Sequence, residues 1–399
     1  MARMLRKSCL FTRSCRTAVK RCVAVVAVVC VIKLVTLLPI YLVTKHRLFN
    51  SFFGKDSVNS FTITTGDSVG NWKDITDFDW RPNLSKVQQL LAYLNMTADE
   101  ARESLPLTLE SRLLLSNDSV CGPADDDPVD LLFLVHTAPL NFQRRLQMRG
   151  SVMGQEHFRP FKVRVVFLLG EVGNSSLQAA LDYEHVLYRD TVQGDFQDSY
   201  RNLSHKGVMG FRWVTRHCPQ ARYVVKLDDD VFFDTYKMLL RYRGIFEGQK
   251  RTIFCNVWVR DSMPVYREDK WAVEERLFQG LDRFPFDYCS GLAVVITGDL
   301  VPALYRAAFF TPVFWIDDIY LFGMLPWVAG DVTMMDLGYR SQYVAMNTTY
   351  ALSCMKELQS ECSVLATNCY TTDDWENMWN LTNNLHVAKG WRVPYLRVN

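Results

Sequence analysis

The stretch YVVKLDDDVFFD, from Tyr223 to Asp234, combines the pattern of a buried strand with a cluster of carboxylates. Its apolar half runs directly into Asp228, Asp229 and Asp230, and bulky apolar residues follow at once. Carboxylates this close repel one another, and the repulsion grows beside a low-dielectric core unless a cation neutralises it. Strand alternation would turn Asp228 and Asp230 to one side of the strand and Asp229 to the other.

Oxygen ligands at the end of a buried strand favour a hard divalent cation. Mn²⁺ and Mg²⁺ both suit carboxylates, and they are commonly bound together with the phosphate oxygens of a substrate. In open α/β sheets, ligands also bind at the carboxyl ends of the strands. The alternative is an exposed acidic turn, but the apolar residues on both sides of the aspartates favour a metal–diphosphate site.

Apolar runs of the same kind occur on both sides of this stretch and predict an α/β domain. A helical pattern lies between two of them at Asp198–Cys218, where apolar and small residues recur at helical spacing. Continuous apolar strands that alternate with helices are typical of a mostly parallel sheet buried on both faces. The predicted strands are Val129–Thr137, Val163–Gly170, Arg222–Leu227, Thr252–Val259 and Leu292–Thr297.

A second carboxylate pair, Asp317 and Asp318, lies between bulky apolar residues in FWIDDIYLFG. Carboxylates in such surroundings are either buried with partners or exposed in a cleft, where one can act as a general base. A helix N-terminus that stabilises both acids through the helix dipole explains the pattern equally well. Arg144, Arg145 and Arg149 follow the first strand and could hold a diphosphate or a carboxylate partner, although a solvated helix face is the simpler interpretation of this group alone.

A basic segment and an apolar run precede this domain. Residues 1–21 carry seven Lys or Arg and no Asp or Glu, whereas the remainder carries 38 basic and 43 acidic residues. The apolar run Cys22–Val43 would span roughly 33 Å as a helix, enough to cross a bilayer core. Its Val, Ile and Leu residues outweigh the insertion cost of Lys33, about 2.5–3.5 kcal/mol. We therefore expect a signal-anchor over residues 22–44 with a cytosolic N-terminus; the alternative, a cleaved signal peptide, lacks a cleavage site.

The overall composition excludes several classes of protein. The chain has 399 residues, of which 49% are hydrophobic and 13% aromatic, so a disordered or collagen-like chain is excluded. A mean hydropathy of -0.05 excludes a multi-span membrane protein. The formal net charge of +2 argues against a nucleic-acid binder.

Sequons and cysteines after the apolar run indicate a lumenal or extracellular body. N-glycosylation and disulfide pairing both belong to the secretory pathway and its oxidising compartments. Sequence alone leaves the pairing open, and seven cysteines leave one unpaired. The seven sequons lie at Asn83, Asn95, Asn117, Asn174, Asn202, Asn347 and Asn380, and the seven cysteines are Cys121, Cys218, Cys255, Cys289, Cys354, Cys362 and Cys369.

The segment 45–128 is mixed in composition and is predicted to be a stem between the membrane and the domain. Ser/Thr/Asn-rich stretches precede a short helix predicted at Leu84–Leu94, and Ala98–Leu115 is amphipathic enough for one or two more. An acidic, proline-containing stretch then places the boundary near Pro128. The predicted order is a tail over 1–21, the anchor over 22–44, the stem over 45–128 and one domain over 129–399.

Taken together, these segments resemble the beta-1,3-glycosyltransferase family of animal Golgi enzymes, which includes beta-1,3-galactosyl- and beta-1,3-N-acetylglucosaminyltransferases. The resemblance covers roughly residues 129–380, and six motifs occur in the family's order. They are RRLQMRGSV (Arg144–Val152), FLLG (Phe167–Gly170), DFQDSYRNLSHK (Asp195–Lys206), KLDDDVF, YCSGLAVVIT (Tyr288–Thr297) and IDDIYLFG.

The resemblance implies a GT-A-type fold and an inverting transfer of a hexose from a UDP-sugar to an acceptor glycan, in the Golgi membrane. Carried onto this chain, Asp230 and Asp228 would bind Mn²⁺ or Mg²⁺, which stabilises the leaving UDP. Asp318, with Asp317 beside it, would take the proton of the acceptor hydroxyl. The residues implied to hold the donor, or to brace its loop and pocket, are Asp228, Asp229, Arg145, Arg149, Asp198 and Lys206.

The sequence departs from the family's pattern in three places. Ser151 and Val152 stand where the family has Thr-Trp, and Asp317 stands where Glu is usual. Asn368 falls where a His often completes the metal shell; its carbonyl oxygen is a weaker ligand, and His386 is an alternative.

Three functions are open at this point. The first is an active sugar transferase that uses galactose, N-acetylglucosamine or N-acetylgalactosamine. The second is a catalytically inactive lumenal relative that binds glycans, which Asn368 favours and the intact carboxylate groups oppose. The third is a cell-surface receptor, which the α/β strand pattern disfavours because ectodomains are usually rich in β-structure.

Overall fold

The computed structural model describes residues 82–123, 128–338 and 343–388. The chain divides into two compact units, Met1–Asp79 and Trp80–Asn399, and every element below belongs to the second. The predicted cytosolic tail and the signal-anchor over residues 22–44 lie outside the described residues. Among the helices that the structure describes, none has the length and apolar character needed to cross a membrane.

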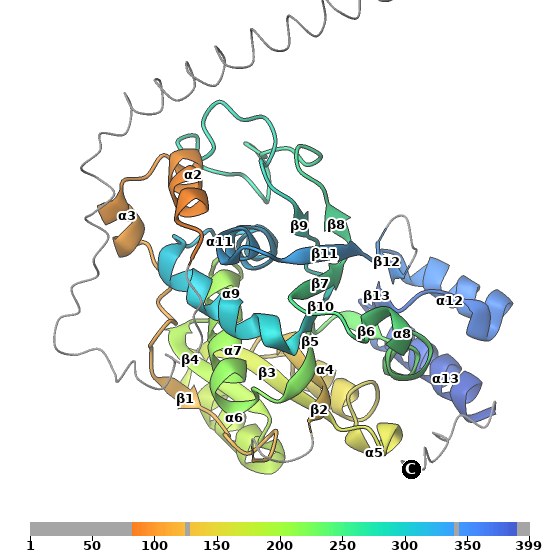
Figure 1. The fold of residues 1–399 in the computed structure, drawn as a ribbon. Coiled ribbons are helices and arrows are strands. Elements are labelled where there is room, and N and C mark those ends of the chain that lie inside the picture. Colours follow the sequence, from red (N-terminus) through yellow and green to blue (C-terminus); the bar gives the residue numbers. More distant parts are fainter. Residues whose placement is uncertain (1–81, 124–127, 339–342, 389–399) are drawn as a thin grey trace, which may run out of the picture. The chain divides into compact units, whose positions relative to one another are not determined.

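An eight-stranded sheet forms the centre of the second unit (Figure 1). Its strands, in spatial order, are β1 (Leu113–Leu115), β4 (Thr191–Gln197), β3 (Val163–Glu171), β2 (Val129–His136), β5 (Ala221–Asp228), β10 (Ala293–Thr297), β7 (Thr252–Cys255) and β11 (Thr333–Asp336). The four strands β4, β3, β2 and β5 are parallel, as are β7 and β11. The pairs β1–β4, β5–β10 and β10–β7 are antiparallel. The predicted α/β class and its mostly parallel sheet are therefore confirmed.

Two small sheets bring distant segments to the end of β5. One contains β12 (Val344–Ala345), β13 (Ala366–Asn368) and β6 (Val231–Phe233), and the other pairs β8 (Val257–Trp258) with β9 (Tyr288–Cys289). Because β6 follows the three aspartates directly, its pairing with β13 places the C-terminal segment beside them.

Helices cover both faces of the large sheet, and each face has its own hydrophobic core. Alternate residues of β2 divide between them: Leu132 and Leu134 face one core, and Leu131, Phe133 and Val135 face the other. The first core is covered by α2 (Leu84–Leu94), α7 (Leu203–His217), α9 (Val301–Ala307) and α11 (Leu325–Ala329). The second is covered by α4 (Phe142–Arg149), α5 (Gln155–Phe158), α8 (Arg243–Phe246), α12 (Thr348–Leu358) and α13 (Thr372–Ala388).

The remaining helical elements are short or connect the longer ones. The α-helices are α3 (Ala98–Glu103), α6 (Ser175–Tyr188) and α10 (Asp317–Ile319). Turns of 3-10 helix occupy Tyr200–Asn202, Gly298–Leu300, Ala308–Phe310 and Gln359–Glu361, and π-helical turns occupy Lys237–Arg241 and Tyr320–Met324.

The predicted strands are all found, and α2 has the predicted bounds, but two local predictions fail. Helix α3 ends at Glu103 rather than continuing toward Leu115, because Pro106 cannot donate a helical hydrogen bond and Leu113–Leu115 pairs as a strand with β4. The strand predicted over Thr252–Val259 is broken at Asn256 into β7 and β8.

The segment assigned to the stem is packed into the second unit from about residue 83 onward. Val87, Leu90 and Leu94 of α2 are buried in the first core. A disulfide also joins Cys121 to Cys218 at the end of α7. The compact unit thus begins at Trp80, well before the boundary predicted near Pro128.

Candidate active site

The strand register places three polar side chains on one face at the carboxyl ends of β2 and β5. Lys226 is opposite Leu134, and Asp228 is opposite His136. Leu134 faces the first core, so alternation turns Lys226, Asp228 and His136 to the same side. This is the side that α7 and α10 occupy.

Lys226 bridges the two carboxylate groups that the sequence analysis singled out. Its ammonium is fully buried and lies 2.9 Å from Asp228 Oδ1 and 3.6 Å from Asp317 Oδ2. Burial works against its charge, but the carboxylates of Asp228, Asp317 and Asp318 outweigh that effect and hold the pKa of Lys226 above its ordinary value. The fold therefore brings residues 228 and 317, which are far apart in sequence, onto one cation.

Asp318 lies beside this bridge, against Gly291. The backbone N–H of Gly291 donates to the Asp318 carboxylate, and Lys226 Nζ donates to the Gly291 carbonyl at 3.1 Å. A Cβ at position 291 would lie 1.8 Å from Asp318 Oδ1, so only glycine allows this approach.

The protonation of this cluster reflects excess negative charge. Burial, together with repulsion by Asp317, raises the pKa of Asp318 to about 7. Burial and the same neighbour raise the pKa of Asp228 to about 6, against the attraction of Lys226. Asp317 and Asp318 do lie in the first turn of α10, as the helix N-terminus alternative predicts. A helix dipole would lower the pKa of Asp318, so burial and repulsion by Asp317 outweigh it there.

The neighbouring His136 is buried and neutral. Burial, with the positive charges of Lys226 and Lys206 nearby, holds its pKa well below the ordinary value. Its Nδ1 lies 3.8 Å from Asp317 Oδ2, and neither ring nitrogen has a hydrogen-bond partner among the described residues. Buried polar atoms without partners are rare in folded proteins and often mark a site that binds something.

Asp229 and Asp230 have different surroundings from Asp228. Asp229 is buried and its Oδ2 accepts hydrogen bonds from Thr137 Oγ1 at 2.5 Å and Asn141 Nδ2 at 2.8 Å. Asp230 is about one-third exposed, and the Arg144 guanidinium lies 3.9 Å from it. Burial, with the adjacent charge of Asp229, raises the pKa of Asp230.

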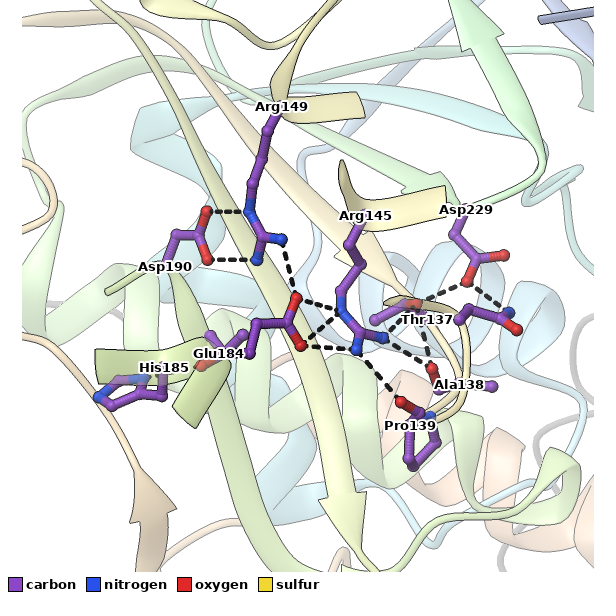
Figure 2. A network of polar contacts seen from close by, with 11 residues as sticks. Thr137, Ala138, Pro139, Arg145, Arg149, Glu184, His185, Asp190 and Asp229 are labelled. Atoms are coloured by element: carbon purple, nitrogen blue, oxygen red, sulfur yellow. Dashed lines mark hydrogen bonds and ion pairs between the residues drawn. The ribbon is translucent and has the colours of Figure 1, made fainter. Parts of the chain in front are cut away.

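Arg145 and Arg149 belong to an ion-pair network behind the cluster, not to the cluster itself (Figure 2). Arg145 is fully buried and forms a paired contact with Glu184 at 2.7–3.2 Å; its other nitrogens donate to the carbonyls of residues 138 and 139. Arg149 forms two 2.7 Å hydrogen bonds to Asp190 and one of 2.8 Å to Glu184. These contacts brace the loop after β2, which is one of the two roles considered for these arginines.

The network reaches the aspartates through a single hydroxyl. Arg145 Nη1 lies 3.3 Å from Thr137 Oγ1, which in turn donates to Asp229 (Figure 2). Asp229 thus takes its position from the chain Glu184–Arg145–Thr137, and it supports the neighbouring carboxylates from behind.

Asp198 and Lys206 lie together, as the resemblance implies. Lys206 Nζ is 2.9 Å from Asp198 Oδ2 and donates to the Thr137 carbonyl at 2.8 Å. The same Asp198 oxygen accepts from the Gly170 backbone at 2.6 Å. Helix α7 can present Lys206 here because it packs closely on the sheet: a Cβ at Gly210 would lie 2.7 Å from a side-chain carbon of Leu168.

Of the two residues suggested to complete a metal shell, Asn368 lies near the aspartates, whereas His386 packs elsewhere. Asn368 in β13 pairs with Val231, one residue beyond Asp230, and its amide nitrogen lies 3.5 Å from the Met346 carbonyl. His386 stacks on Tyr236 at 4.4 Å and lies 3.4 Å from Asp234, which gives it a structural role in the packing of α13.

The carboxylates fit a divalent cation that arrives with a diphosphate. No group of three or more His, Cys, Asp or Glu side chains in the described part of the chain is arranged to hold a metal alone. Mg²⁺-type ions, however, are usually bound by one or two carboxylates plus substrate phosphates. The raised pKa values of Asp228 and Asp230 mark negative charge that such a cation would neutralise.

Sequence analysis missed several members of this site. Lys226 and His136 were placed within predicted strands and given no role, although a lysine inside an apolar strand next to three aspartates is itself a signal. Glu184 and Asp190, the partners of the arginines, come from α6 and the residues just after it, and nothing in the sequence pattern links them to the first strand.

Six of the seven cysteines in the described residues form disulfides. Disulfides join Cys121 to Cys218, Cys255 to Cys289 and Cys354 to Cys362, and Cys369 is free and buried. The expectation that one of the seven is left over is therefore confirmed for the described residues.

Comparison with known proteins places the two carboxylate groups within one family segment. Residues 143–333 match the family model described as galactosyltransferase. This match confirms the resemblance to sugar transferases that the motifs predicted.

Three mouse proteins illustrate the similarity. Beta-1,3-galactosyltransferase 4 is 42% identical over 134 residues, which cover 34% of this chain and 35% of that protein. UDP-GalNAc:beta-1,3-N-acetylgalactosaminyltransferase 1 is 31% identical over 197 residues, covering 48% and 58%. Beta-1,3-galactosyltransferase 1 is 27% identical over 191 residues, also covering 48% and 58%. The chain thus spans 35–58% of the length of these relatives.

Similarity to solved structures is more distant. The galactosyltransferase LgtC in complex with donor and acceptor sugar analogs aligns with a TM-score of 0.33 and 11% sequence identity, over 63% of this chain and 95% of that chain. This likeness is too distant to guide the assignment of a function.

Proposed function

We propose that this chain, whose residues 143–333 match the family model described as galactosyltransferase, is an inverting beta-1,3-glycosyltransferase. It moves galactose or an N-acetylhexosamine from a UDP-sugar to a hydroxyl of an acceptor glycan. The observation that carries this proposal is the bridge of Lys226 between Asp228 and Asp317, with Asp318 beside it. Lys226 thereby links Asp228, on the donor side of the proposed site, to the pair Asp317 and Asp318, which can act on the acceptor.

Asp318 is the general base in this proposal. A pKa of about 7 makes its carboxylate a stronger base than an ordinary aspartate, while much of it remains deprotonated near neutral pH. Asp317 is less suited because its carboxylate already faces Lys226 and the ring of His136. The Gly291 N–H fixes the Asp318 carboxylate in one orientation.

The reaction is a single displacement. The acceptor oxygen attacks the anomeric carbon, its proton passes to Asp318, and the bond from that carbon to the diphosphate oxygen breaks. UDP leaves with the electron pair, and one direct attack inverts the configuration at the anomeric carbon.

Asp230 and Asp228 would hold the divalent cation and, with it, the diphosphate. When bound, the cation neutralises the charge that develops on the leaving diphosphate. Asp198, just after β4, and Lys206 of α7 support the donor pocket, since Asp198 accepts from the Gly170 backbone and Lys206 donates to the Thr137 carbonyl. The GT-A-type architecture and the β-1,3 linkage belong to the same proposal.

The proposed location is the Golgi membrane, with the described unit on the lumenal side. Asn83, Asn174 and Asn347 of the sequons cap helices through the side-chain oxygen, which leaves the amide nitrogen, the atom that carries a glycan, free of that role. All three are exposed. The three disulfides also favour an oxidising compartment.

The experiment is a donor screen with the purified full chain and Mn²⁺. A panel of UDP-galactose, UDP-N-acetylgalactosamine and UDP-N-acetylglucosamine is incubated with the protein, and UDP release and UDP affinity are both measured. We expect one donor to be hydrolysed or transferred. Tight UDP binding without turnover of any donor would instead identify the inactive glycan-binding relative, and the absence of both would overturn the proposal.

A further inference from the structure

A cluster of aromatic side chains at the surface is not used by the proposed chemistry. Tyr200 and Trp271 are 46% and 44% exposed. Trp271 Nε1 lies 3.3 Å from the Tyr200 hydroxyl, and the Tyr200 ring lies 6.3 Å from that of Trp315. Three segments distant in sequence therefore contribute to one aromatic surface.

This aromatic cluster adjoins the carboxylates. Trp315 precedes Asp317 by two residues, and Tyr200 follows Asp198 by two. The cluster therefore includes residues of both the segment that carries the proposed base and the segment that supports the donor pocket.

A second path connects Trp271 to the base. Its ring lies 6.0 Å from the ring of Tyr266. Tyr266 in turn lies close enough to Tyr288 to influence it electrostatically, as does Asp318, and burial with these two neighbours raises the pKa of Tyr288. The loop that carries Trp271 is thus continuous with the Asp318 side of the site.

Two cations lie on these rings. The Arg201 guanidinium is 3.6 Å from the centre of the Trp315 ring, and the Lys270 ammonium is 4.5 Å from Tyr200 and 5.3 Å from Trp271. Neither forms an ion pair with a carboxylate of the described residues. Both are exposed, so their positive charges face the space in front of the aromatic surface.

An exposed aromatic ring and a cation without an ion-pair partner together favour a sugar that carries a negative charge. The C–H face of a pyranose packs against the face of an indole or phenol ring. A carboxylate or sulfate on a neighbouring sugar would pair with the arginine or the lysine.

We propose that Tyr200, Trp271 and Trp315 form the acceptor subsite, and that Arg201 and Lys270 adapt it to a negatively charged acceptor glycan. The proposal rests on the proposed function, and it names the acceptor class that this function leaves open. One sugar ring stacks on the aromatic surface beside Asp318, and an acidic sugar or sulfate meets the cations at its edge.

The test measures saccharide binding without a donor, separately from UDP binding. The dissociation constants of lactose, 3′-sialyllactose and 3′-sulfolactose are determined for the full chain by ligand-observed NMR. We expect both charged sugars to bind at least about fivefold more tightly than lactose, and the ratio between them to tell a carboxylate from a sulfate preference. Lys270→Ala should reduce this advantage, whereas Lys356→Ala on the exposed face of α12 should not.

Stacking is tested at Trp271. Trp271→Ala should weaken all three saccharides about three- to tenfold and raise the acceptor KM with little change in kcat. Trp271→Phe should recover most of the loss, and Tyr183→Ala, which removes a 71% exposed ring from α6, should have no effect.

The outcomes separate this proposal from the proposed function. Equal binding of lactose and the charged sugars, or saccharide affinities unchanged in Trp271→Ala, would overturn the acceptor subsite. Loss of UDP affinity in Trp271→Ala, with saccharide binding retained, would show that the ring stacks on the nucleotide, and that result also overturns it. Wild-type protein that binds no UDP would contradict the proposed function instead.

Discussion

Two neighbouring groups of charged residues, which are linked through Thr137 and Asp229, differ in the balance of their charges. In the network of Arg145, Arg149, Glu184 and Asp190, each guanidinium meets a carboxylate at hydrogen-bond distance. Although burial alone would raise it, the pKa of Glu184 is lowered because two arginines hold it.

In the carboxylate cluster, the balance is the opposite. Asp228, Asp317 and Asp318 share the single buried ammonium of Lys226, and the pKa values of Asp228 and Asp318 rise to about 6 and 7. A balanced network is satisfied by the fold and holds position. An unbalanced one retains negative charge that a cation or a proton can neutralise, and perturbed groups of this kind gather at functional sites.

The largest effect is expected for Asp318→Asn. The amide keeps the size of the side chain but cannot take a proton, so kcat should fall about 10²- to 10⁴-fold. UDP affinity should remain close to that of the wild type, because the donor is held by other residues. Turnover similar to the wild type would remove Asp318 as the base.

Arg145→Met should lower the free energy of unfolding. It leaves Glu184 buried with half of its partners, and breaking a buried pair costs about 3–5 kcal/mol. The measurement is the free energy of unfolding in denaturant. The control is Arg222→Met, which removes a half-exposed pair with Asp130 and should cost about 0–1 kcal/mol. Equal costs for the two variants would mean that the network does not brace the fold.

Gly291→Ala should displace the base without removing it. Its Cβ would overlap Asp318 Oδ1, and misplacement by about 1 Å can cost roughly 10²-fold in rate. Gly244→Ala is the matched control, since no heavy atom lies near a Cβ there. If kcat is the same in both variants, the contact between Gly291 and Asp318 has no part in catalysis.

The smallest effect is expected in the dependence of kcat/KM on pH. The pKa of Asp318 is raised to about 7, so the base is protonated below that value and kcat/KM should fall about tenfold per pH unit. Repulsion by Asp317 contributes to the shift, so Asp317→Asn should move the bend in the profile to lower pH. A flat profile between about pH 5 and 8 would contradict the assignment of a perturbed carboxylate.

Features that a short stretch of sequence encodes were predictable, whereas features that depend on contacts between distant elements were not. The strands of the parallel sheet are long apolar runs, and Asp228–Asp230 and Asp317–Asp318 are contiguous in sequence, so both were found. Strand β4 was missed because TVQGDFQ is largely polar and contains Gly194, where a Cβ would collide with Met209. That glycine reflects a helix packing on the strand, which no local pattern records.

The partners of the arginines and the extent of the unit were not predictable for a similar reason. Glu184 meets Arg145 only because α6 and α4 lie side by side, a relation between elements 39 residues apart. Residues from about 83 onward follow a Ser/Thr/Asn-rich stretch that suggested a stem, yet α2 buries three apolar side chains in the first core. Burial against distant elements, not composition, decides where the unit begins.

The central claim is that the unbalanced carboxylates bind a cation together with a diphosphate. Calorimetric titration of UDP into the full chain, with and without Mn²⁺, tests it directly when wild type is compared with Asp230→Ala. The account predicts that Mn²⁺ strengthens UDP binding in the wild type and that Asp230→Ala loses this gain. UDP affinity that is independent of Mn²⁺, or that is unchanged in Asp230→Ala, would contradict it.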